Sequence, residues 1–162
     1  MFTSESTIGA KLSFDVGKGI LDRENGCSDV KGYKNPILTV DGVLVVNGKL
    51  LLVRRGREPE KGKLALPGGI VEYGERTEDA IIRELKEETG IDARLIRLLG
   101  VYSDPGRDPR GHFITVAYVL DQIGGELLAG DDAADAVFLP TKQLPLLAFD
   151  HSRIVKDFLG QK

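Results

Sequence analysis

Three glutamates near the middle of the chain have types and a spacing suited to binding a metal ion. Glu84, Glu87 and Glu88 lie within one predicted helix, and at about 100° per residue they share a single arc of its surface. Like charges at this spacing repel one another, so either solvent together with Lys86 or a bound cation must offset the repulsion. Carboxylates are ligands for hard cations such as Mg²⁺, which commonly hold substrate phosphates as well. Helix composition alone leaves a solvated acidic surface and a metal site both open.

The elements that position these carboxylates follow from local sequence. A helix is predicted from about Thr77 to Thr89, because acidic residues favour its N-terminal end and Gly90 suits the left-handed conformation that ends a helix. Asn47-Gly48 joins two apolar runs and predicts a β-hairpin. The expected strands are residues 37–46, 49–55, 93–104 and 112–121. Residues 61–69 are expected to form a short strand that ends in a loop at Pro67 and the two glycines after it. A second helix at 149–159 is expected to be capped by Asp150.

Strands before, between and after two helices predict an α/β fold of the α+β type, with a mixed β-sheet sandwiched between α-helices. Residues 1–33 show no helix or strand period and are interpreted as an N-terminal extension of unknown role, and residues 34–162 as one domain.

The spacing from Gly69 to Ile91 closely resembles the signature box of the Nudix hydrolases. A glycine is followed by Glu75, then by Arg83-Glu84, and finally by Glu87-Glu88 and a glycine, with every position of the box filled. The resemblance implies a Nudix fold and hydrolysis of a nucleoside diphosphate linked to another group, with Mg²⁺ as cofactor and Mn²⁺ as a substitute.

Family roles can be carried over by position. The resemblance implies that Glu84, Glu87, Glu88 and the backbone carbonyl of Gly68 hold the metal. It further implies that Glu75 and Arg83 orient these carboxylates, although the same two residues could form an ordinary surface ion pair.

The resemblance implies a general base drawn either from the box or from a later loop, and the stretch "AGDDAADA" offers such a loop. Asp131 and Asp132 follow a predicted strand there. Asp132 is the favoured extra metal ligand or base, with an acidic turn between strands as the alternative.

A second motif, "YSDPGRDPRGH", resembles the corresponding segment of ADP-ribose pyrophosphatases and of ADP-ribose-sensing Nudix regulators. Arg107 and Arg110 could donate paired hydrogen bonds to phosphate. Ser103 and His112 are added as candidate substrate-binding residues, although the stretch could also be a charged hairpin loop.

Composition restricts the function classes. A net charge of −3 disfavours a nucleic-acid partner, and no apolar run is long enough to span a membrane. The single cysteine, Cys27, permits neither an intramolecular disulfide nor a cysteine-rich zinc site. Cytoplasmic residence is therefore expected.

The expected reaction is hydrolysis of ADP-ribose to AMP and ribose 5-phosphate. One alternative is a nucleoside triphosphate pyrophosphohydrolase, and a weaker one is a non-catalytic ADP-ribose sensor, whose box would typically be damaged. A homodimer is a further expectation, since family members often pair.

Overall fold

A computed structural model describes residues 34–128 and 136–161 of the chain. The contacts set apart Asn35–Lys162 as one compact unit. Its described elements, in chain order, are β1 (Ile37–Val46), β2 (Lys49–Arg54), β3 (Leu64–Ala65), β4 (Gly68–Ile70), α1 (Thr77–Thr89), β5 (Ile91–Tyr102), β6 (Phe113–Gly125), β7 (Ala136–Pro140) and α2 (His151–Gly160).

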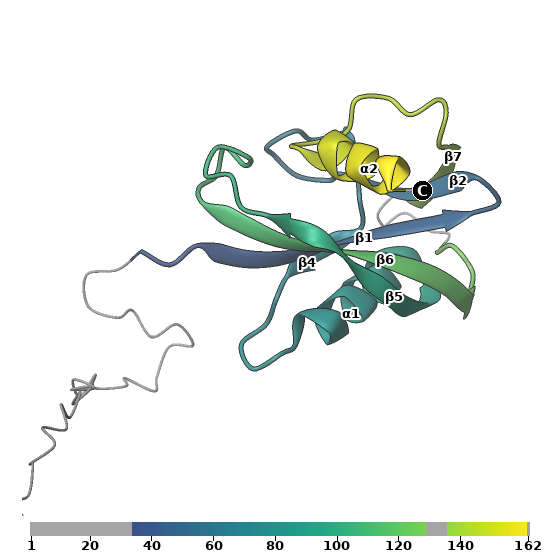
Figure 1. Cartoon of the computed structure of the whole chain (residues 1–162), viewed down its shortest axis with the longest axis horizontal. Coiled ribbons are helices and arrows are strands. Elements are labelled where there is room, and N and C mark those ends of the chain that lie inside the picture. Colours follow the sequence, from purple (N-terminus) through teal and green to yellow (C-terminus); the bar gives the residue numbers. More distant parts are fainter. Residues whose placement is uncertain (1–33, 129–135, 162) are drawn as a thin grey trace, which may run out of the picture. The chain divides into compact units, whose positions relative to one another are not determined.

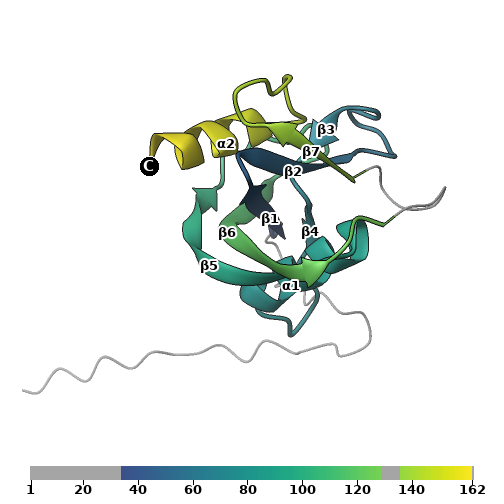
Figure 2. The ribbon, with the colours of Figure 1, turned by 90° about the vertical axis from the view of Figure 1, so that its right-hand side faces the viewer.

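The strands form one mixed sheet ordered β3-β2-β1-β6-β5, with β4 paired to β1 and β7 paired to β2 (Figure 2). Strand β1 is central, because it runs parallel to β6 and antiparallel to both β2 and β4. Gly68 and Gly69 of β4 lie opposite Asp41 and Val40 of β1. The pairing therefore brings the glycine pair at the start of the box next to the middle of the central strand.

The two helices cover opposite faces of this sheet (Figure 1). Because successive strand residues point to opposite faces, Leu51 of β2 packs in the cluster that contains Ile81 of α1, whereas Leu52 packs in the cluster that contains Ile154 of α2. A strand buried on both faces needs a continuous apolar run, which explains the uninterrupted leucines of β2. The expected mixed sheet between helices is confirmed.

Local signals placed the helix and the hairpin correctly. Helix α1 spans the predicted residues, and Gly90 ends it in the left-handed conformation with a φ of 77°, donating its N–H to the Lys86 carbonyl. At the hairpin, Asn47 and Gly48 both have positive φ, as a tight turn between twisted strands requires.

Other predictions need correction. Asp150 precedes α2 but makes no side-chain cap bond, because its carboxylate binds Arg107 instead. The glycine pair after Pro67 was expected to form a loop and instead begins strand β4, while β7 was not foreseen. In the part of the chain that the structure describes, no helix is long and apolar enough to cross a membrane.

Candidate active site

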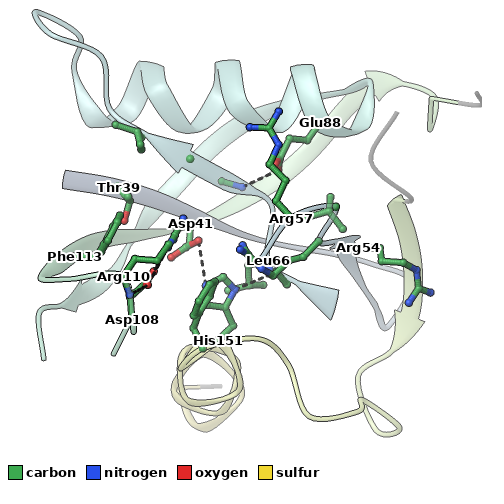
Figure 3. Close-up of a pocket in the computed structure, with 18 of the residues that line it drawn as sticks. Thr39, Asp41, Arg54, Arg57, Leu66, Glu88, Asp108, Arg110, Phe113 and His151 are labelled. Atoms are coloured by element: carbon green, nitrogen blue, oxygen red, sulfur yellow. Dashed lines mark hydrogen bonds and ion pairs between the residues drawn. The ribbon is translucent and has the colours of Figure 1, made fainter. Parts of the chain in front are cut away.

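Glu88 extends from α1 toward a cavity, beside strand β4 (Figure 3). Ala80, Ile81 and Leu85 are fully buried against the sheet, which fixes the rotation of the helix about its axis. Glu88 then reaches β4, where its Oε2 accepts a hydrogen bond of 3.0 Å from the backbone N–H of Gly68. The helix thus delivers one carboxylate directly to the glycine pair.

Arg83 lies between three acidic side chains. Its Nε and Nη2 donate to the two carboxylate oxygens of Glu75, at 2.8 and 2.9 Å. Its Nη1 donates to Glu84 at 2.8 Å and to Glu87 at 3.3 Å. The Arg83 guanidinium is the largest cause that lowers the pKa of Glu75 to about 2. This cation therefore holds the box carboxylates in fixed positions.

The two glycines of β4 leave no room for side chains. A Cβ on Gly68 would lie 2.0 Å from the carbonyl oxygen of Val40, and one on Gly69 would lie 2.3 Å from the carboxyl carbon of Glu84. Neither distance is compatible with a side chain, so only glycine lets the backbone approach the carboxylates this closely.

Glu88 occupies an environment that disfavours its charged form. Burial raises its pKa to about 7, and the Gly68 N–H donor opposes that shift, whereas the nearby carboxylates Glu84 and Asp41 reinforce it. Carboxyl groups are thus concentrated beside the glycine pair, where a bound cation would favour their charged forms.

The donor set fits a hard divalent cation, since carboxylate oxygens surround a stretch of backbone without side chains. As the side chains stand, however, residues 34–128 and 136–161 contain no group of three or more His, Cys, Asp or Glu side chains placed to hold an ion. Glu84 and Glu87 bind Arg83 instead. They would have to turn toward Glu88 to share a cation with it.

A cavity of about 870 Å³ opens beside Glu88 and the glycine pair (Figure 3). It is bounded by β1, by the loop after β2 and by the loop between β5 and β6. Its polar and aromatic lining includes Thr39, Asp41, Arg54, Arg55, Arg57, Lys61, Glu88, Arg107, Asp108, Arg110, Phe113, Phe149 and His151.

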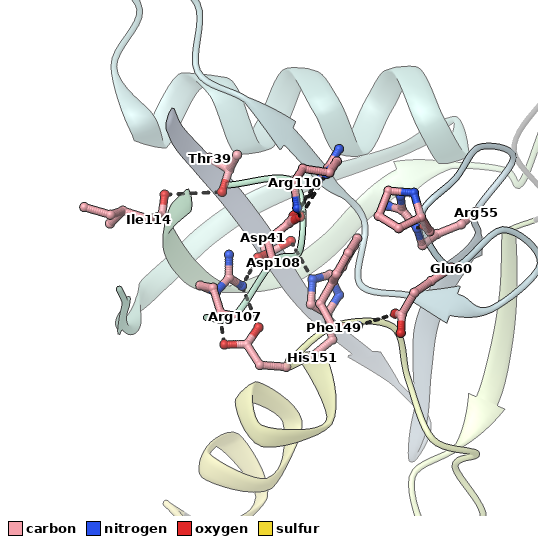
Figure 4. A network of polar contacts seen from close by, with 12 residues as sticks. Thr39, Asp41, Arg55, Glu60, Arg107, Asp108, Arg110, Ile114, Phe149 and His151 are labelled. Atoms are coloured by element: carbon pink, nitrogen blue, oxygen red, sulfur yellow. Dashed lines mark hydrogen bonds and ion pairs between the residues drawn. The ribbon is translucent and has the colours of Figure 1, made fainter. Parts of the chain in front are cut away.

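Arg107 lies in the wall of this cavity but is occupied by the protein itself (Figure 4). Only 5% of its side chain is exposed, and it forms a two-pronged ion pair with Asp150, at 3.0 and 2.6 Å. Asp41 lies 3.7 Å away on the other side. This geometry is that of a buried ion pair joining the β5–β6 loop to the start of α2.

Arg110 is more accessible, with 44% of its side chain exposed. Asp108 accepts hydrogen bonds from its Nε and Nη2. The guanidinium lies 4.6 Å from the ring centre of Phe113 and 5.4 Å from that of Phe149. Of the two loop arginines, Arg110 is therefore the one free to meet a ligand.

The other predicted site residues lie elsewhere. Ser103 lines a separate hollow of about 910 Å³ between the end of β5 and α2. Nε2 of His112 lies 3.3 Å from the Ser103 carbonyl, and neither residue lines the cavity beside Glu88. Asp131 and Asp132 fall outside the described residues.

Sequence patterns did not identify several of the residues that line the cavity. Asp41 and His151 are both buried, with Nε2 of His151 3.6 Å from Asp41 Oδ1, and Nδ1 of His151 accepts the N–H of Leu66 at 2.9 Å. Nδ1 must be unprotonated to accept that bond, so the proton of a neutral ring faces Asp41. Strand pairing and docking of α2 bring these residues together, which local patterns do not reveal. The dense cations after β2 were the one available signal.

Comparison with known proteins agrees with this geometry. Residues 36–158 match the family model of the NUDIX domain. The sequence is 52% identical over 137 residues to the ADP-ribose pyrophosphatase of Methanocaldococcus jannaschii, covering 83% of this chain and 81% of that protein.

Two solved structures are similar in fold. A MutT/nudix family protein from Enterococcus faecalis has a TM-score of 0.68 at 36% identity, covering 80% of this chain and 62% of that one. The NUDIX domain of Shewanella oneidensis NrtR, solved in complex with ADP ribose, has a TM-score of 0.69 at 30% identity, covering 82% of this chain and 92% of that one.

The fold, the box on α1 and these matches define a metal-dependent hydrolase. The chain belongs to the Nudix hydrolase family, and the resemblance expected from the box is confirmed. Hydrolases of this family generally need a divalent metal.

Proposed function

We propose that this chain hydrolyses ADP-ribose to AMP and ribose 5-phosphate, with Mg²⁺ as its metal and Mn²⁺ as a substitute. The observation that carries the proposal is a single cavity in which Glu88 shares the lining with Arg55 and Arg110. One proposed acidic metal ligand thus lies in the same cavity as cations that suit a diphosphate. The M. jannaschii relative, named an ADP-ribose pyrophosphatase, supports the choice of substrate.

The proposed reaction assigns a task to each group of residues. Water attacks one phosphorus of the diphosphate, the bond from that phosphorus to the bridging oxygen breaks, and the bridging oxygen leaves with the other phosphate. A metal bound there would stabilise the developing charge and acidify the attacking water. Arg83, held by Glu75, keeps the ligands in place. The proposed ligands are Glu84, Glu87, Glu88 and the carbonyl oxygen of Gly68.

Asp132 stays the proposed extra ligand or general base. Replacing Asp132 by Asn is expected to lower kcat strongly and to change its dependence on pH, because a carboxamide cannot accept the proton of water at neutral pH. An unchanged pH profile in the variant would remove Asp132 from this role.

Metal removal tests the acidic site. Hydrolysis of ADP-ribose is expected to stop in EDTA and to return with added Mg²⁺ or Mn²⁺. The variant Glu88→Gln is expected to lose orders of magnitude in turnover while remaining folded, as judged by circular dichroism. Full activity of EDTA-treated protein would contradict the metal assignment.

A substrate panel tests the choice of ADP-ribose. Catalytic efficiency would be compared for ADP-ribose, ADP-glucose, NADH, diadenosine polyphosphates, 8-oxo-dGTP and dCTP. ADP-ribose is expected to rank first. A nucleoside triphosphate in first place would favour the house-cleaning alternative, and tight ADP-ribose binding without turnover would favour a sensor.

Cytoplasmic residence and a homodimer belong to the same proposal. Both follow from the family resemblance and the composition. Cell fractionation tests the first, and light scattering tests the second.

A further inference from the structure

Four side chains beside the acidic helix alternate between aromatic ring and guanidinium. The guanidinium carbon of Arg110 lies 4.6 Å from the ring centre of Phe113 and 5.4 Å from the ring centre of Phe149. Arg55 lies 4.4 Å from the Phe149 ring centre and completes the series. All four residues, referred to below as the arginine ladder, line the cavity that contains Glu88. They come from three separate parts of the chain: the end of the β2 segment, the β5–β6 loop with the start of β6, and the residues before α2.

The Arg55 side chain is held in place, although not all of its hydrogen-bond donors have a partner among the described residues. Its Nε donates to the Pro59 carbonyl at 3.0 Å, and stacking on Phe149 fixes the plane of the guanidinium. Glu60 is nearby, but its two oxygens are taken by Lys63 and by the backbone N–H of Phe149. Among the residues that the structure describes, none accepts a hydrogen bond from either terminal nitrogen of Arg55.

The electrostatic environment of Arg55 also lacks a full counter-charge. Burial lowers the pKa of the Arg55 guanidinium below its ordinary value, and the Arg110 cation acts in the same direction, against the carboxylates of Asp108 and Glu60. The guanidinium groups of Arg55 and Arg110 thus both lie against the Phe149 ring. Among the described residues, the Asp108 carboxylate is hydrogen-bonded only to Arg110. An anion between the two guanidinium groups would relieve their repulsion.

Phe149, one of the two aromatic residues of the arginine ladder, has an unusual backbone conformation. Its φ is 51°, in the left-handed region that residues other than glycine rarely occupy. The backbone N–H of Phe149 donates to Glu60 at 2.6 Å, and Glu60 itself has a φ of 64°. Strained residues of this kind persist only where the surroundings enforce them, and they are common at ligand sites.

We propose that the arginine ladder is a preformed anion site that binds the diphosphate of the substrate through the open terminal nitrogens of Arg55 and Arg110. Asp108 takes Nε and Nη2 of Arg110, which leaves Nη1 for the ligand. The rungs already lie at stacking distance, so a nucleobase cannot enter between them without displacing a side chain. The inference rests on the proposed function only in taking a diphosphate as the substrate group.

Binding of inorganic pyrophosphate and of ADP-ribose in EDTA tests the ladder without turnover. The full chain would be compared with Arg55→Gln, Arg110→Gln, Phe149→Leu and Arg97→Gln by calorimetry, after thermal melts show that each variant is folded. Each ladder arginine variant is expected to raise Kd about ten-fold or more for both ligands, because a charge-assisted hydrogen bond is lost. Arg97 is exposed on β5 and lies outside the cavity, so its variant removes equal charge and should bind normally.

Two further variants separate stacking from charge. Arg55→Lys keeps the charge and is expected to recover only part of the affinity, since an ammonium lacks the planar pair of donors. If Phe149 acts by orienting Arg55, the double variant Arg55→Gln/Phe149→Leu should raise Kd by less than the product of the single effects.

The outcomes distinguish the two proposals. Wild-type protein that fails to bind pyrophosphate, or ladder variants that bind it as tightly as Arg97→Gln, would overturn the ladder. Ladder-dependent pyrophosphate binding together with a different preferred substrate would overturn ADP-ribose as the substrate and leave the ladder standing.

Discussion

The effect of the Glu88 carboxylate on the stability of the protein depends on whether a cation is bound. The metal-free protein must bury its carboxylate near Glu84 and Asp41, with one backbone donor from Gly68 as compensation. A bound cation would reverse this cost, so the same side chain destabilises one state and anchors a ligand in the other.

The stability of the metal-free protein is therefore expected to fall with rising pH. Burial holds the pKa of Glu88 at about 7 in the folded state, above its ordinary value of 4.5. Between those values the unfolded chain has released a proton that the folded chain keeps, so the contribution of Glu88 to stability is fully present below pH 4.5 and is lost as pH rises through 7. The loss is about 3 kcal/mol at most. Thermal melts in EDTA across this range measure it.

Two variants provide the comparison for that pH profile. Glu88→Gln should flatten the slope and melt higher than wild type near neutral pH. Glu87→Gln removes a carboxylate of the same helix whose side chain is 60% exposed, and it should leave the slope intact. An identical slope in wild type and Glu88→Gln would mean that another group titrates.

The glycine pair permits a second residue-scale prediction. A methyl group at position 69 would overlap the carboxyl carbon of Glu84, so Gly69→Ala should displace that ligand and lower kcat while the protein still folds. Gly160→Ala is the matched control, because a Cβ there meets nothing within 4 Å. Equal activity in the two variants would show that the position of Glu84 is unimportant.

At the scale of elements, the loop between β5 and β6 assigns different tasks to its two arginines. Arg107 joins the loop to α2 through Asp150, and Arg110 extends along the cavity on Phe113. Sequence spacing treated them as equivalent phosphate ligands. Their different burial decides between the two tasks, and burial depends on an element far along the chain.

Replacing each arginine by Ala should separate these tasks. Arg107→Ala leaves Asp150 and Asp41 without their cation and should cost about 3–5 kcal/mol of stability, as the loss of one partner of a buried ion pair does. Arg110→Ala should cost less stability and raise KM for ADP-ribose about ten-fold. Urea unfolding and steady-state kinetics measure the two effects. The reverse pattern would make Arg107 the substrate ligand.

The elements also show what sequence reasoning can reach. Helix α1, the turn at Asn47-Gly48 and the box spacing are encoded within a few residues of each other, so local rules find them. The pairing of Asp41 with His151 and the ladder that ends at Arg55 depend on how β1, α2 and the loop after β2 pack together. These contacts join distant segments, so no hydrophobic periodicity in the sequence indicates them.

At the scale of the whole molecule, all buried apolar residues of the described core come from one continuous part of the sequence. Its buried apolar side chains run from Val40 to Phe158, and the family match covers residues 36–158. Both helices, every described strand and the cavity lining lie within residues 37–160. The proposed status of residues 1–33 as a separate extension can be tested directly.

A fragment of residues 34–162 is expected to unfold cooperatively, close to the melting temperature of the full chain, and to keep its hydrolytic activity, because it retains the entire described core and cavity. If the extension packs across a partner, the full chain should scatter light as a dimer of 17.6 kDa subunits, and the fragment as a monomer. A full chain at 17.6 kDa at micromolar concentration would contradict the dimer. A fragment that fails to fold would contradict the boundary after residue 33, and a dimeric fragment would place the interface within the Nudix domain.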